Sequence, residues 1–257
     1  MKHIYKIAAL AALVGSTQVQ AVPLSFWNTD GWTGFVSEDQ TTNYLNPGWG
    51  GQYFDAEYLY YKVSGNTLHL GLQTGFDVAG DYHPTTNPNA GSQVYSGKRY
   101  YSGDLALSFG DTASYTWNYG VDFGFDTKDI NHTRINMGGP GADIAGLYSN
   151  TTYAGDLSFQ ASDPFAIDSG SFAGMITQNS GSGFNADGYG GNNTSYWRTV
   201  SFDATGLDLS NVDVHWTMSC GNDEIQGSFS VPEPSMLSLL GFSLLSLGFI
   251  RRRKSKA

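Results

Sequence analysis

The segment 56–75, "AEYLYYKVSGNTLHLGLQTG", decides the fold class of this chain of 257 residues. Two apolar-rich runs, 58–63 and 67–73, flank a short turn with the sequence Ser-Gly-Asn at 64–66. A turn of that length forces the two runs to pair as an antiparallel hairpin. Leu68, Leu70 and Leu72 recur at every second position, the period of a strand with one buried face. We therefore predict a hairpin with His69 on its outward face.

The same period of two recurs farther along the chain. Four more segments show it: 103–110 (GDLALSFG), 117–125 (WNYGVDFGF), 195–203 (SYWRTVSFD) and 212–218 (VDVHWTM). A strand with one apolar face needs a second apolar face against it. The sequence thus predicts an all-β fold, an antiparallel β-sandwich of jelly-roll-like type, with a signal helix before it and a transmembrane helix after it. Segments 81–97 and 178–194 have few apolar residues and are expected to be long loops.

Charge and cysteine content limit the function of the body. All 23 acidic residues lie between Asp30 and Glu233, where only six basic residues occur, so this stretch carries a net charge of −17. Such a field repels phosphate backbones, which excludes nucleic acid as an expected partner. Cys220 is the single cysteine, so no intramolecular disulfide can form. The body must be held together by packing alone.

The N-terminus has the pattern of a secretory signal peptide. Lys2 and Lys6 give a positive start, 7–14 is apolar, and Val19 and Ala21 supply small residues before a cleavage site. We expect a signal peptide over 1–21, a β-sandwich body over 22–230 and a separate tail over 231–257.

The tail, "VPEPSMLSLLGFSLLSLGFIRRRKSKA", combines two prolines, an uncharged run and a positive end. Pro232 and Pro234 favour an extended chain. A helix over 235–250 is shorter than the ~30 Å hydrocarbon core of a bilayer, so it makes a marginal permanent anchor. The cations that follow should stay on the cytoplasmic side, which leaves the body outside; they are Arg251, Arg252, Arg253 and Lys254.

This tail resembles the PEP-CTERM sorting signal of exopolysaccharide-producing Gram-negative bacteria. Pro232, Glu233 and Pro234 match the recognition motif of that signal, and the apolar run and Arg-rich end follow in the same order. The resemblance implies an exosortase, a membrane transpeptidase that acts near this motif, as partner. It also implies that the tail anchors the body transiently before delivery to the cell surface or outside the cell.

Candidate binding residues in the body are aspartates and one tryptophan. Five aspartates have carboxylate oxygens of the kind that calcium prefers, although turn formation explains them more simply: Asp77, Asp81, Asp122, Asp126 and Asp129. Calcium is therefore the one cofactor considered. Trp49 lies in the turn-forming stretch 46–51, "NPGWGG", and is the candidate for contact with a glycan.

The order of features over 55–125 also resembles bacterial surface sandwiches of the family-9 carbohydrate-binding type, and no ligand residue follows from that pattern. We expect a non-enzymatic structural or glycan- or calcium-binding module of the cell surface or extracellular matrix, with extracellular polysaccharide as a further partner. The alternative is a secreted glycan-active hydrolase that uses two of the aspartates. A pair of carboxylates about 5 to 9 Å apart in a concave site would distinguish the enzyme.

Overall fold

The structure, a computed structural model, describes residues 23–37, 51–110, 115–135, 144–154, 162–186 and 193–231. The predicted signal peptide 1–21, Trp49 and the tail from Pro232 onward lie outside the described residues. Within the described part of the chain, no helix is long and apolar enough to cross a membrane. The helices described there are two 3-10 turns, η1 (Ser25–Asn28) and η3 (Gln52–Phe54). The prediction of an all-β fold is confirmed.

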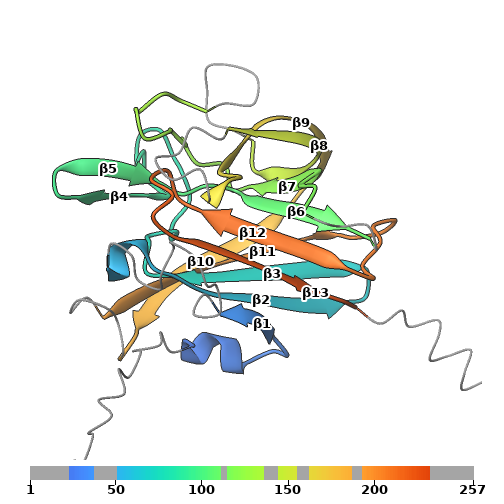
Figure 1. Cartoon of the computed structure of the whole chain (residues 1–257). Helices are drawn as coiled ribbons and strands as arrows, with labels where there is room; N and C mark the ends of the chain where they lie inside the picture. The colour runs from blue at the N-terminus through green and yellow to red at the C-terminus, as the bar shows by residue number, and fades with distance from the viewer. Residues whose placement is uncertain are drawn as a thin grey trace, which may run out of the picture.

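Two large antiparallel sheets and a small hairpin make up the described fold (Figure 1). The first sheet has the order β1 (Thr33–Ser37), β2 (Ala56–Ser64), β3 (Thr67–Thr74), β11 (Thr194–Asp203), β10 (Thr177–Phe184). The second has the order β13 (Glu224–Phe229), β12 (Val212–Thr217), β6 (Leu105–Phe109), β7 (Tyr119–Asp122), β8 (Gly146–Ala154), β9 (Ala166–Gly174). Strands β4 (Ser92–Tyr95) and β5 (Lys98–Tyr101) pair separately.

The two large sheets share one hydrophobic core. Leu68, Leu70 and Leu72 of β3 belong to the same buried cluster as Val214 and Trp216 of β12. Phe76, directly after β3, meets the Trp216 ring at 6.1 Å between centroids, which joins the two layers. Burying such side chains contributes about 1.5–3 kcal/mol each, so this core supplies the stability that a disulfide cannot.

The predicted hairpin over 58–73 and the predicted strand over 212–218 both form, the latter as β12. Strands β2 and β3 pair without a shift from Tyr58 to Ser64, around the turn at Gly65, whose φ of +60° suits a glycine. His69 faces away from the core, where Trp32 covers it edge to face at 6.2 Å between ring centroids.

Three sequence expectations, two about loops and one about strand length, were wrong at least in part. The segment 178–194 was expected to be a loop, but residues 177–184 form β10, an edge strand paired with β11 over its whole length. Part of the expected loop 81–97 forms β4. Conversely, the expected strand over 117–125 is limited to β7, although Phe123 and Phe125 beyond it are still buried.

Candidate functional site

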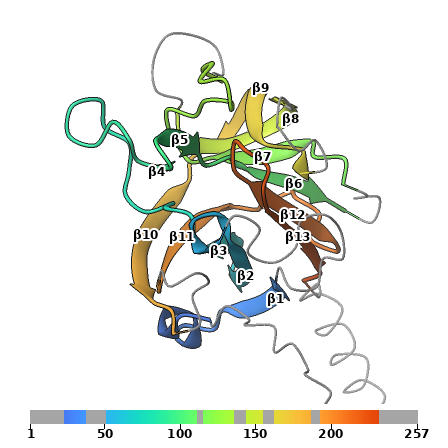
Figure 2. The same cartoon turned by 60° about the vertical axis from the view of Figure 1, so that its left-hand side comes forward.

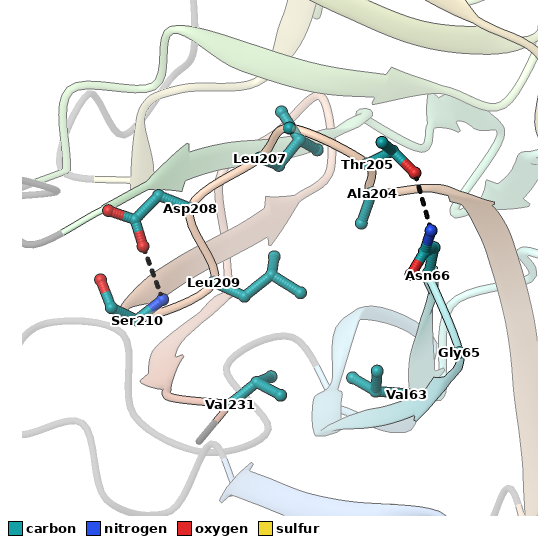
Figure 3. Close-up of a pocket in the computed structure, with 11 residues that line it drawn as sticks. Val63, Gly65, Asn66, Ala204, Thr205, Leu207, Asp208, Leu209, Ser210 and Val231 are labelled. Atoms are coloured by element: carbon teal, nitrogen blue, oxygen red, sulfur yellow. Dashed lines mark hydrogen bonds between the residues drawn. The ribbon is translucent and has the colours of Figure 1, made fainter. Parts of the chain in front are cut away.

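A pocket of about 510 Å³ opens at the end of the sandwich where the chain leaves β13. The turn between β2 and β3, the connection between β11 and β12, and Val231 surround it (Figure 3). Its lining residues are Val63, Gly65, Asn66, Ala204, Thr205, Gly206, Leu207, Asp208, Leu209, Ser210 and Val231. We call this the exit pocket.

Hydrogen bonds between its loops fix the shape of the exit pocket. The Ala204 amide donates to the Asn66 carbonyl at 2.8 Å, and Asn66 Nδ2 donates to Thr205 Oγ1 at 3.2 Å. Leu207 N donates to Ala204 O at 3.0 Å, which closes a tight turn in the β11–β12 connection. These bonds hold the two loops together around the pocket.

The pocket has an apolar floor and an acidic rim. Val63, Leu207 and Leu209 pack against the main core, which leaves carbon surface facing the opening. At the rim, hydrogen bonds from Ser210 lower the pKa of Asp208; beside the pocket and outside its lining, hydrogen bonds from Thr205 lower the pKa of Asp203. Both carboxylates are therefore anionic at neutral pH. The pocket suits an apolar group that is flanked by a cation.

Val231 connects the exit pocket to the tail. Its amide donates to the Leu209 carbonyl at 2.9 Å, and its side chain packs against the main core. The described body therefore extends to the residue before Pro232. Residues 230–254 match the PEP-CTERM protein-sorting motif. The sorting motif thus begins at the wall of the exit pocket, and the sequence resemblance of the tail is supported.

The remaining two comparisons concern curated proteins and solved structures. No curated protein and no solved structure matches this chain. The resemblance of 55–125 to family-9 carbohydrate-binding sandwiches therefore gains no support.

The candidate calcium ligands Asp77 and Asp81 lie beside a buried arginine. The Arg198 side chain is fully buried, and its Nη1 lies 3.3 Å from Asp81 Oδ1. Arg198 also donates to the carbonyl of Val78 at 2.8 Å and to Gln178 Oε1 at 2.7 Å. Burial raises the pKa of Asp77, whose Oδ1 accepts the Ala79 amide at 3.0 Å. A guanidinium already provides the positive charge that a cation would bring to this place.

The other three aspartates are used in turns and an ion pair. Asp122 Oδ1 accepts the Gly124 amide at 2.6 Å, and Asp129 Oδ1 accepts the Thr133 amide at 2.7 Å. Asp126 pairs with Arg134 and with Lys128 Nζ, the latter at 3.2 Å. The structure does not bring the five aspartates together. Over the described ranges, no three His, Cys, Asp or Glu side chains are grouped to hold a metal.

Sequence reasoning missed a buried carboxylate, Glu57. It is 1% exposed, and burial raises its pKa to about 7, with Asp55 adding to the effect and hydrogen bonds opposing it. Ser195 Oγ and Gln52 Nε2 donate to Oε1 at 2.5 and 2.6 Å, and Gln73 donates to Oε2. The strand register shifts between Ala56 and Tyr58, so Glu57 sits on a bulge that an alternating pattern does not predict.

Aromatic side chains cover the outer face of the first sheet. The Trp27 ring stacks on Tyr60 at 4.2 Å between centroids and is 4% exposed, while its Nε1 donates to Gln73 Oε1. The Phe26 ring stacks on Trp197 at 3.9 Å, beside a second pocket of about 250 Å³ that Phe184 also lines. Phe184 is 74% exposed. Trp27 and Phe54 are thus buried, whereas the second pocket keeps aromatic surface accessible.

Proposed function

We propose that this chain is an exported protein that an exosortase-type membrane transpeptidase processes at 232–234, which delivers the body to the cell surface or extracellular matrix. The carrying observation is that 230–254 match the sorting motif directly after a body that is packed as far as Val231. The predicted signal peptide 1–21 and the basic end 251–257 agree with this route, because both orient the body outward.

The short connection to the tail determines which end of the body meets the enzyme. Only Pro232, Glu233 and Pro234 separate Val231 from the helix predicted over 235–250. Extended, this connection spans roughly 13 Å, so an enzyme acting there must approach the exit pocket. We expect its outward-facing loops to contact the pocket rim, and the anionic Asp203 and Asp208 favour a basic surface on the enzyme.

The body itself is proposed to be a non-enzymatic structural or glycan-binding module. The exit pocket has one carboxylate, Asp208, among its lining residues, whereas glycoside hydrolysis uses a pair. Glu57 has the pKa of a general acid, but it is buried in a hydrogen-bond network and lines neither of the pockets described above. No observation of this kind favours the hydrolase alternative.

Glycan binding is favoured by the second pocket, formed by Phe26, Phe184 and Trp197. Aromatic faces stack on the apolar faces of sugar rings, and the exposed Phe184 side chain offers such a face. Trp49 stays a candidate for the same role. The calcium hypothesis receives no comparable support from the aspartates described above.

Processing is tested by replacing Pro232, Glu233 and Pro234 with alanine in a host that has a cognate exosortase. The variant should accumulate as a membrane-retained form with an intact tail. Lys98→Ala, an exposed position far from the tail in sequence, is the matched control and should be processed normally. Equal processing of the triple variant and the control would contradict the proposal.

A further inference from the structure

Four strands form the edges of the two large sheets, and three of them are irregular or covered. Strand β1 is five residues long and shifts register against β2. Strand β13 is covered, because it lies against β1 and β2 of the other sheet. Strand β9 shifts register against β8 at three places. Strand β10 instead pairs with β11 along all eight of its residues without a shift. In Figure 2 it forms the outer margin of the first sheet.

The composition of β10 lacks the usual protection of an edge strand. Natural sheets discourage pairing with other chains by charges, prolines, bulges or short edge strands. The sequence of β10, TQNSGSGF, has no charged residue and no proline. The uncharged stretch is longer than the strand and covers 169–186, whereas β9 carries Asp168 and β13 carries Glu224. Within the described ranges, β10 is thus a long, regular and uncharged sheet edge.

The hydrogen bonds of Ser180 indicate how the outer side of β10 is used. The Ser180 amide donates to the side chain of Asn179, Oδ1, at 3.0 Å, a bond outside the β10–β11 ladder, and Ser180 Oγ accepts the Gly80 amide at 3.0 Å. We infer that the Ser180 amide faces the open edge. In an antiparallel ladder, residues alternate between the two sides, so Ser182 shares the outward direction of Ser180. Outward amides of this kind can pair with another strand. The Asn179 side chain competes with such pairing at one position.

We propose that β10 pairs antiparallel with β10 of a second copy of this chain, so that the two first sheets become one continuous sheet. In a two-fold antiparallel pair, residue i of one copy faces residue j of the other and j faces i, so a charged residue near the axis would lie close to its own copy and be repelled. An uncharged strand avoids this cost, and the −17 charge lies elsewhere on the body. Because the bodies still repel at long range, salt should strengthen the association. This inference does not depend on how the tail is processed.

The first test measures self-association of the full chain in mild detergent by sedimentation at low and high salt. Ser182→Pro removes an outward amide without removing a β11 bond, and should weaken association on the order of tenfold. Asn179→Ala releases the Ser180 amide and should strengthen association severalfold. Edge pairing predicts opposite changes in self-association for these two neighbouring exposed residues, whereas general destabilisation does not. Thermal unfolding of each variant records any loss of stability.

The second test adds one cysteine at a time at each position of 177–184. A disulfide needs Cα atoms within about 7 Å, so cross-linking should peak at the residue nearest the two-fold axis and fall on both sides. The native Cys220 does not interfere, because it is 3% exposed and burial raises its pKa to about 12. A monomer at all salt concentrations, uniform cross-linking along β10, or association unaffected by Ser182→Pro would overturn the proposal.

Discussion

Glu57→Gln should change how the stability of the body depends on pH. The carboxyl of Glu57 has a pKa of about 7 in the folded chain against 4.5 as its ordinary value. The folded state therefore binds more protons than the unfolded state between these values, and stability falls as pH rises through that window. A difference of about 2.5 units corresponds to roughly 3 kcal/mol in the free energy of unfolding, fully present below pH 4.5 and lost above about pH 7.

The assay is urea unfolding of the full chain in mild detergent between pH 4 and 8. Tryptophan fluorescence follows the unfolding, and Trp27, one of six tryptophans, is linked to the site because its Nε1 donates to Gln73, which in turn donates to Glu57. Glu57→Gln cannot ionise, so the gap between the wild-type and variant stability curves should change by roughly 3 kcal/mol across the window. Asp168→Asn, at an exposed position, serves as the control. Parallel wild-type and Glu57→Gln curves would refute the assignment.

Three further predictions concern the tail connection, a buried cation and the aromatic pocket. Asp208→Lys should slow processing, measured as the half-time of the uncleaved form on immunoblots. A flexible spacer of about ten residues inserted between Val231 and Pro232 should make processing insensitive to this substitution. Arg198→Met should lower the free energy of unfolding by about 2–4 kcal/mol, since it leaves the Val78 carbonyl and Gln178 Oε1 without the Arg198 donors, and a loss below 1 kcal/mol in urea unfolding would contradict this. Phe184→Ala should weaken binding on a glycan array without lowering the melting temperature, because the side chain is 74% exposed, and unchanged binding would remove the aromatic pocket from consideration.

The predictable parts of the fold are those whose pattern is local. Leu68, Leu70 and Leu72 alternate beside a short turn, so the β2–β3 hairpin follows from the sequence alone. Strand β12 is similar, because Val212, Val214 and Trp216 all point into the core and all are 0% exposed.

The unpredicted parts depend on neighbours distant in sequence. Strand β10 is rich in Gly, Ser and Asn, which favour turns, and it becomes a strand because β11 offers a complete partner ladder. Gly181 also admits the Trp197 ring, since a Cβ there would lie 2.7 Å from it. Glu57 is buried because donors from η3, β3 and β11 converge on it, and no local pattern announces such a set.

The candidate site likewise has one part that the sequence predicts and one part that it does not. The sorting motif is a linear signal, so the residues 232–234 and the cations after 250 were recognised directly. The exit pocket is formed by two loops that are about 140 positions apart, Asn66 and Ala204 being joined by a backbone hydrogen bond, and only the fold brings them together. The five aspartates illustrate the reverse case, since their composition suggested a metal and their contacts serve turns and ion pairs.

The central claim is that the tail is a processing signal for a body that ends at Val231. The most direct test is intact-mass spectrometry of the protein recovered from the cell surface and medium, for wild type and for the variant with alanine at 232–234. We predict that the wild-type protein has lost Arg251 to Lys254, and that the variant stays in the membrane fraction with these residues present. Wild-type surface protein that retains the basic end, or a variant with the same mature mass as wild type, would contradict the account.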